Sequence, residues 1–309
     1  MKVLVTNDDG IDAPGLHALA RALVAAGRDV VVVAPARDMS GSGAAIGQVH
    51  LDQSIDARRV ELPGLEGVPA YALDGAPGLC VLAARLGGFG DPPDVVMSGI
   101  NPGCNTGRAV LHSGTVGAAL TAANFGVRGL AVSIDVVSTR VQEQGAVSVA
   151  DGEAASMDVV DTGDGPEPAG DQPGAGANGR SARPRVPCHW DTAGTAAARA
   201  LDWLMAAPEG TVLNVNVPDR ALEDLAGVRA ATLAPFGTVR TSVVESAETH
   251  GRLQLEMRPT QADLPPGCDT ALVGAGYVAV SAITGVHLDD RVDVQPVLDT
   301  LLVGSRSSA

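Results

Sequence analysis

Two adjacent carboxylates stand at the end of the first apolar stretch of the chain. Residues 2–6 read KVLVT, and Asp8 and Asp9 follow after one intervening residue. Neighbouring like charges repel, so a chain that places such a pair where a strand ends needs a positive partner to offset the repulsion. A divalent cation would neutralise both carboxylates at once.

Two later loops carry further small side chains with oxygen atoms. ARDMSGSG contains Ser40, SGINPGCNTG contains Asn101, and each segment follows an apolar run of strand length. Loops that follow parallel strands converge at the carboxyl edge of the sheet, where ligands bind. Carboxylate, hydroxyl and amide oxygens suit Mg²⁺, Mn²⁺ or Ca²⁺ and not zinc or copper. The three loops therefore predict a site for a hard divalent cation.

The segment HSGTVGAAL predicts an anion site. Ser113, Gly114 and Thr115 lead into a predicted helix, and hydroxyls with unpaired N–H groups at a helix N-terminus bind phosphate readily. A cation facing a phosphate cradle suits phosphoryl hydrolysis, because the metal polarises the P–O bonds. Each motif also has a structural explanation: SGT can be an ordinary N-cap, and the glycines can form tight turns. Their joint occurrence at successive strand ends favours the catalytic interpretation.

An alternation of strands and helices positions these loops. Residues 2–6 and 29–36 are strand-like, and residues 13–27 between them have helical spacing, with Pro14 in the first turn and Gly27 at the end. This order predicts a βαβ unit with a parallel, right-handed crossover. Further helices are expected at 78–88, 114–126 and 192–207, and further strands at 93–100, 129–134 and 211–218. The pattern predicts an α/β domain over residues 1–220, with a mostly parallel sheet flanked by helices.

Beyond about residue 219 the rhythm changes. Strands are expected at 229–235, 241–246 and 252–259, followed by a last strand at 276–283 and a helix at 294–304. We therefore predict a smaller, β-hairpin-rich C-terminal lobe over residues 221–309.

Residues 141–179 do not fit the α/β alternation. They contain eight acidic residues, no Lys or Arg, and repeated Gly and Pro. Such a segment buries too little apolar surface to offset its ordering entropy, so we predict a solvated, disordered insertion. An acidic lid over a basic ligand is the alternative.

Composition excludes several classes of protein. The chain has 36 acidic and 21 basic residues, a net charge of −15, which argues against a binder of nucleic acid duplexes. Its four cysteines form no CxxC or Cys/His cluster, so we do not expect structural zinc. Their spacing favours a protein of a reducing compartment. The sequence shows neither a signal peptide nor an apolar run of membrane-spanning length. We expect a soluble, cytoplasmic protein with no membrane partner.

In their order and separations, VTNDDGIDAPGL, MSGSG, SGINPGCNTG and HSGTVGAAL closely resemble the motifs of the SurE family, the stationary-phase survival protein nucleotidases. The resemblance resumes after the insertion with LNVNVPD and CDTALVGAGYVAVSAIT. It implies a Rossmann-like domain and a C-terminal lobe that exchanges elements within a homodimer or homotetramer. It also implies a metal-dependent phosphatase that hydrolyses nucleoside 5′- and 3′-monophosphates, with one divalent cation, Mg²⁺ or Mn²⁺, per subunit.

The resemblance also implies roles for individual residues. The family's metal ligands fall on Asp8, Asp9, Ser40 and Asn101. Its phosphate contacts fall on Asn105, Ser113, Gly114 and Thr115. Asp8 is the residue that we assign to activating the attacking water, and a direct attack of Asp8 on phosphorus is the alternative. His112, next to the phosphate cradle, is a candidate for protonating the leaving group or stacking on a base.

The chain departs from the family pattern at four positions. His112 and Thr121 stand where the family usually has Tyr and an acidic residue, and Ala76 and Leu79 make GAPGLCV out of a motif resembling GTPADCV. None of these changes removes a metal ligand, so we expect catalysis to persist. The alternatives are a non-catalytic or narrowed-specificity nucleotide- or metal-binding protein, and a phosphatase dedicated to a biosynthetic pathway. A serine hydrolase is disfavoured because the chain has no G-x-S-x-G motif.

Overall fold

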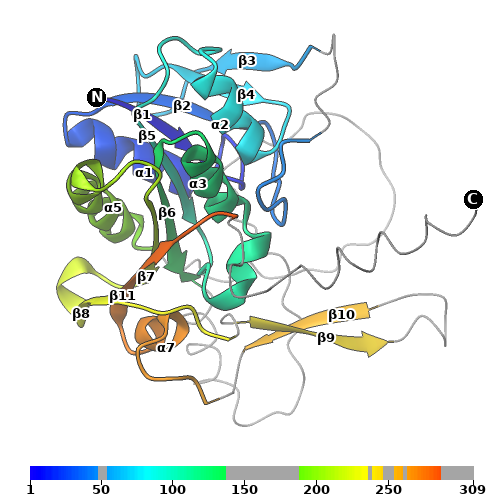
Figure 1. Cartoon of the computed structure of the whole chain (residues 1–309), viewed down its shortest axis with the longest axis vertical. Helices are drawn as coiled ribbons and strands as arrows, with labels where there is room; N and C mark the ends of the chain where they lie inside the picture. The colour runs from blue at the N-terminus through cyan, green and yellow to red at the C-terminus, as the bar shows by residue number, and fades with distance from the viewer. Residues whose placement is uncertain (48–53, 137–187, 236–238, 246–253, 260–262, 287–309) are drawn as a thin grey trace, which may run out of the picture.

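The computed structural model describes residues 1–47, 54–136, 188–235, 239–245, 254–259 and 263–286. The predicted insertion at 141–179 and the predicted helix at 294–304 lie outside these residues. A nine-stranded sheet with helices on both faces forms the main body (Figure 1). The prediction of an α/β fold with a mostly parallel, helix-flanked sheet is confirmed.

The middle of the sheet is a block of six parallel strands. In spatial order these are β4 (Ala70–Leu73), β2 (Asp29–Pro35), β1 (Lys2–Thr6), β5 (Val95–Asn101), β6 (Arg128–Asp135) and β7 (Val212–Pro218). All six are rich in Val, Leu, Ile or Ala, as expected for strands buried on both faces.

Three strands extend this block at its edges. β3 (Ala57–Val60) runs antiparallel to β4 at one edge, β11 (Tyr277–Ile283) runs antiparallel to β7, and β8 (Gly227–Ala230) lies beyond β11. A separate antiparallel pair, β9 (Val239–Glu245) and β10 (Gln254–Pro259), lies apart from the helix-covered part of the sheet (Figure 1). Two strands from beyond residue 220 thus join the main sheet. The domain boundary at that residue stays a prediction.

Helices cover both faces of the sheet. α1 (Pro14–Ala25) and α5 (Trp190–Ala206) pack with Val3 and Val5 on one face, whereas α2 (Pro77–Arg85) and α3 (Gly114–Asn124) pack with Leu4 on the other. The alternation along β1 follows from the two-residue period of a strand. α1 begins at Pro14 and is followed by Gly27 in the left-handed region, as the sequence predicts.

The order of the strands creates a switch point between β1 and β5. The chain moves from β1 outward through β2 and β4, then returns to the other side of β1 and continues through β5, β6 and β7. Crossovers leave these two strands in opposite directions, so their carboxyl ends border a crevice in which ligands of open α/β sheets bind. Asp8 and Asp9 follow β1 directly, and Asn101 is the last residue of β5.

Candidate functional site

Local hydrogen bonds shape the loop that carries the two carboxylates. The side chain of Asn7 donates to the Gly10 carbonyl at 3.0 Å and accepts from the Gly10 N–H at 3.3 Å. Gly10 has a φ of 103°, which a side chain would disfavour. The backbone N–H of Met39 donates to the Asp8 carbonyl at 2.7 Å, which ties the loop after β2 to the loop after β1.

Asp8 is almost fully buried and faces the first turn of α3. Its Oδ2 accepts a hydrogen bond from the Gly114 N–H at 3.1 Å, and its Oδ1 accepts one from the Thr115 hydroxyl. Burial raises the pKa of Asp8, and the hydrogen bonds from Thr115 and Gly114 oppose that rise. The carboxylate thus lies at the positive end of α3, where a negative charge is stabilised.

Gly114 permits this close approach. A Cβ atom at position 114 would lie 2.7 Å from the Cβ of Asp8 and 2.7 Å from the Oγ of Ser42, inside contact distance of both. Any side chain larger than hydrogen would therefore push α3 away from Asp8. The glycine of the SGT segment has a steric role here.

Asp9 and the segment after β2 form a region of unbalanced negative charge. The Oδ2 of Asp9 is shielded from solvent and has no hydrogen-bond partner among the described residues. Burial, with the charges of Asp8 and Asp38, raises the pKa of Asp9 to about 8. Ser40 is exposed, and its hydroxyl and N–H donate to Asp38 Oδ1 at 2.6 and 2.7 Å. A cation would relieve the repulsion between these carboxylates.

The two asparagines of the loop after β5 point to different neighbours. The Oδ1 of Asn101 lies 3.4 Å from the Thr115 hydroxyl oxygen, which places it on the Asp8 side. The Nδ2 of Asn105 donates instead to the Oγ of Ser133 on β6 at 2.9 Å. Of the predicted residues, Asp8, Asn101, Gly114 and Thr115 are therefore linked by direct contacts.

Ser113 and His112 occupy the junction between the 3₁₀ helix η1 (Gly107–His112) and α3. The Oγ of Ser113 accepts a hydrogen bond from the Val116 N–H at 3.1 Å, so Ser113 is the N-cap of α3. The His112 side chain is exposed, and its carbonyl accepts from the Gly43 N–H at 3.2 Å. This backbone bond connects the loop after β2 to the start of α3.

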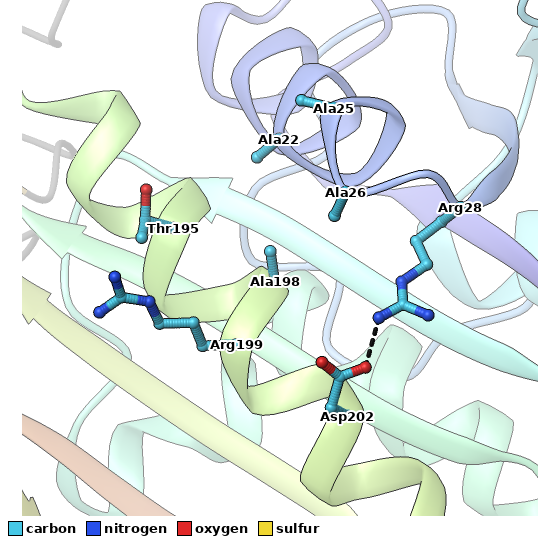
Figure 2. Close-up of a pocket in the computed structure, with 8 residues that line it drawn as sticks. All are labelled: Ala22, Ala25, Ala26, Arg28, Thr195, Ala198, Arg199 and Asp202. Atoms are coloured by element: carbon cyan, nitrogen blue, oxygen red, sulfur yellow. Dashed lines mark hydrogen bonds and ion pairs between the residues drawn. The ribbon is translucent and has the colours of Figure 1, made fainter.

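A hollow lies between α1 and α5, away from the switch point (Figure 2). Half of its eight lining residues are alanine, and its polar groups include Arg28 and Asp202, which form an ion pair with each other. It adjoins the C-terminal end of α1, which lies at the amino edge of the parallel strands, opposite the switch point. None of the predicted site residues lines it, so the switch point remains the candidate site.

Comparison with known proteins agrees with this geometry. The profile of the family described as Survival protein SurE matches residues 3–238, which is most of the chain. This chain belongs to the SurE family. The family resemblance carried by the sequence motifs is thereby confirmed.

Several SurE proteins are similar over nearly the full length. A protein named 5′-nucleotidase SurE from Xanthomonas euvesicatoria pv. vesicatoria is 34% identical, covering 94% of this chain and 90% of its own. A 5′-nucleotidase SurE from Xanthomonas oryzae pv. oryzae is 33% identical over the same shares. The crystal structure of the SurE protein from Aquifex aeolicus matches 97% of this chain and 99% of its own, with a TM-score of 0.66 and 24% identity. That structure supports the SurE fold.

The structure adds polar residues that sequence reasoning did not select for the SurE site. Ser42 lies beside Gly114, and its buried Oγ has no hydrogen-bond partner among the described residues. Asn214 and Asn216 on β7 both bond to the Asn105 backbone. The alternation of asparagine and valine in LNVNVPD was a usable signal, because polar side chains at every second position of a buried strand share one face.

The types of side chain near the switch point limit how a metal ion could be held. No three His, Cys, Asp or Glu side chains in the described part of the chain form a cluster that could hold a metal ion. A cation would therefore depend on the two carboxylates together with hydroxyl and amide oxygens. In the same part of the chain, no helix has the length and apolar character needed to cross a membrane.

Without a divalent cation, Asp9 should make the folding stability depend on pH. The pKa of Asp9 is about 8 in the folded protein and about 4 in an unfolded chain. Between these values the folded state holds a proton that the unfolded state has released, so stability falls as pH rises from about 4 to about 8. We expect the melting temperature in EDTA to decrease across this range.

Asp9→Asn should reduce this dependence, to which Asp8 also contributes because burial raises its pKa. Asp12→Asn, which changes an exposed carboxylate in the same loop, should leave the dependence unchanged. Adding a divalent cation to the wild type should raise the melting temperature more at pH 8 than at pH 5, because only the ionised carboxylate binds it. An equal slope in the wild type and Asp9→Asn would show that Asp9 is not the titrating group.

Proposed function

We propose that this chain is a 5′-nucleotidase, which hydrolyses the phosphate monoester of nucleoside monophosphates. The observation that carries the proposal is the convergence of Asp8, Asn101 and Thr115 at the switch point, against the N-terminus of α3. The names of the relatives at 33–34% identity, 5′-nucleotidase SurE, support the same reaction. The likeness extends over nearly the full length of both chains.

The site fits a hard divalent cation. Its oxygen donors are the expected kind, and one shielded oxygen of Asp9, beside mutually repelling carboxylates, has no hydrogen-bond partner in the described part of the chain. Asp8, Asp9, Ser40 and Asn101 would hold the cation, which is Mg²⁺ or Mn²⁺ in this proposal. Once bound, such a cation supplies Lewis acidity that polarises the P–O bonds.

Asp8 is proposed to accept a proton from the attacking water. Burial raises its pKa, which makes the ionised carboxylate a stronger base than an exposed one. The hydrogen bonds from Gly114 and Thr115 hold both carboxylate oxygens in place, so the group is oriented before substrate arrives. Orientation of this kind lowers the barrier without further reorganisation.

The residues that start α3 are proposed to bind the phosphate. Ser113 uses its oxygen as an acceptor for the helix cap, so its hydroxyl proton is available to a phosphate oxygen. Thr115 has a single hydroxyl proton, which it gives to Asp8, so it must change partner in order to bind phosphate. His112 is exposed beside this cradle and is proposed to contact the leaving group or the base.

The proposal extends to the finer properties that the family resemblance implies. These are hydrolysis of 3′-monophosphates, a homodimeric or homotetrameric assembly and a cytoplasmic location. Sedimentation of the purified chain measures the assembly, and fractionation of the source cell measures the location.

The test is phosphate release from a panel of nucleoside 5′- and 3′-monophosphates, with and without EDTA. We expect release in Mg²⁺ or Mn²⁺, loss of release in EDTA, and recovery when the cation is restored. Hydrolysis of one panel member alone would indicate a dedicated phosphatase. Binding of nucleotides without hydrolysis under any of these conditions would contradict the proposal and favour a non-catalytic binding protein.

A further inference from the structure

Two asparagines of β7 hold the backbone of Asn105. Asn214 and Asn216 are fully buried and donate through Nδ2 to the Asn105 carbonyl at 2.8 and 3.0 Å. The Oδ1 of Asn216 also accepts the Asn105 N–H at 2.8 Å. Asn216 therefore pairs with both backbone groups of Asn105, as a neighbouring strand would. Neither asparagine has a role in the chemistry described above.

A buried carboxylate holds the end of the loop after β5, the loop that contains Asn105. Asp269, the first residue of α7 (Asp269–Gly274), is fully buried, and its Oδ2 accepts the Gly107 N–H at 2.8 Å. Its Oδ1 accepts the N–H groups of Ala234 and Thr270 at 2.9 and 2.8 Å. Burying a carboxylate is unfavourable unless donors satisfy it. The donor from Gly107 makes this loop part of that compensation.

These contacts leave Asn105 few free groups. Its N–H and carbonyl are bound to β7, and one Nδ2 hydrogen is bound to Ser133 on β6. The second Nδ2 hydrogen is then the donor that remains for an anion. A residue whose backbone and side chain are both held by hydrogen bonds binds without the entropy cost of ordering a mobile loop.

We propose that Asn214, Asn216 and Asp269 are positioning residues that fix Asn105 and the start of η1 for binding the substrate phosphate. The inference rests on the proposed function together with the phosphate contact that the family resemblance implies for Asn105. It gives a role to the motifs LNVNVPD and CDTALVG, which lie far along the chain from the cation-binding motifs. The N-terminal half would supply the cation ligands, and residues beyond 210 would set the geometry of the loop between β5 and η1 that contains Asn105.

This division of roles along the chain predicts separate effects on the binding of the cation and of the phosphate. Three of the four proposed cation ligands, Asp8, Asp9 and Ser40, lie on loops that Asn216 and Asp269 do not contact by any hydrogen bond of the described residues. The fourth, Asn101, precedes the Asn105 loop and is held separately, by the pairing of β5 with Ser133 on β6. Loss of a positioning contact should therefore weaken phosphate binding and leave cation binding unchanged. A general loss of packing would instead weaken both.

Two variants each remove the contacts of one positioning residue with the loop after β5. In Asp269→Asn, the remaining carbonyl oxygen can still serve Ala234 and Thr270, while the amide NH₂ group faces the Gly107 N–H, so only the loop contact is lost. Asn216→Ala removes the two bonds from Asn216 to the Asn105 backbone and leaves the one from Asn214. The control is Ser281→Ala on β11, because Ser281 is buried beside Asn214 and donates to the Ala231 carbonyl without contacting the loop.

Calorimetric binding of inorganic phosphate, in the presence of saturating Mn²⁺, measures the effect without requiring turnover. We expect both variants to bind phosphate at least about tenfold more weakly than the wild type, with Mn²⁺ affinity within about twofold. The Ser281→Ala variant should retain both affinities. In an Asn105→Ala background, Asn216→Ala should have little further effect, because both changes act through one side chain.

Three results would each overturn the inference. One is that the losses from Asn105→Ala and Asn216→Ala add in the double variant. The others are a phosphate affinity equal to that of Ser281→Ala, and a parallel loss of Mn²⁺ affinity. Nucleotide hydrolysis measured on the same samples tests the proposed function separately. A wild type that binds phosphate but hydrolyses no mononucleotide would contradict the function and leave the positioning role standing.

Discussion

Asp8→Asn and Asp9→Asn are each expected to abolish phosphate release from nucleoside monophosphates while leaving the fold intact. Both carboxylates are proposed cation ligands, and Asp8 is also the proposed base. An amide carries no charge and accepts no proton at neutral pH, so either change removes a function that no neighbouring residue can replace. Turnover at saturating Mg²⁺ or Mn²⁺ measures the effect, and circular dichroism checks the fold.

The structure predicts different side effects for the two variants. Asn at position 8 can still accept from Thr115, but its NH₂ group then faces the Gly114 N–H, so one hydrogen bond is lost. Asn at position 9 removes a carboxylate whose pKa burial and its acidic neighbours raise. In EDTA near pH 8, Asp9→Asn should therefore be at least as stable as the wild type.

Asp12→Asn is the matched control, because Asp12 is an exposed carboxylate in the same loop. It should retain full turnover. Turnover in Asp9→Asn equal to that of the Asp12→Asn control would remove Asp9 from the cation site, and the same result for Asp8→Asn would remove both of its proposed roles.

The strands and helices that carry the site could be predicted because their signals are local. β1 and β2 contain unbroken apolar runs, β5 begins with one, and α1 begins at a proline. The four-residue strands β3 and β4 and the six-residue α7 were not predicted, because so few residues show no period. The pairing of β11 with β7 was also missed, since a strand's sequence does not state which edge it joins.

The same limit applies within the site. Asp8 and Thr115 could each be selected from a motif, but the hydrogen bond between them joins residues 107 positions apart. The bonds from β7 to Asn105 span 109 and 111 positions, and they depend on which strands become neighbours. Residue types at strand ends therefore predicted a common location for the site. They did not predict which side chains form hydrogen bonds with one another.

Ser113→Ala and Thr115→Val are each expected to weaken inhibition by inorganic phosphate and to lower kcat/KM by about tenfold or more. A hydrogen bond to a charged group contributes about 1.5–3 kcal/mol, which corresponds to that loss. Thr121→Val is the control for Thr115→Val: its hydroxyl is also buried in α3, but it donates to the Gly117 carbonyl at 2.7 Å. That variant should keep its phosphate affinity.

The two variants should differ in their effects on the rest of the protein. Ser113 caps α3, so Ser113→Ala should also cost about 1 kcal/mol of stability, visible as a lower melting temperature. Thr115→Val removes the hydroxyl that donates to Asp8, so its loss should fall more heavily on kcat than on KM. Neither hydroxyl is a proposed cation ligand, so cation affinity without phosphate should barely change.

Variants that lose cation binding but bind phosphate normally would show that the two halves of the site are assigned the wrong way round. Variants that change neither binding nor turnover would show that SGT is only a helix cap and that the phosphate is held elsewhere.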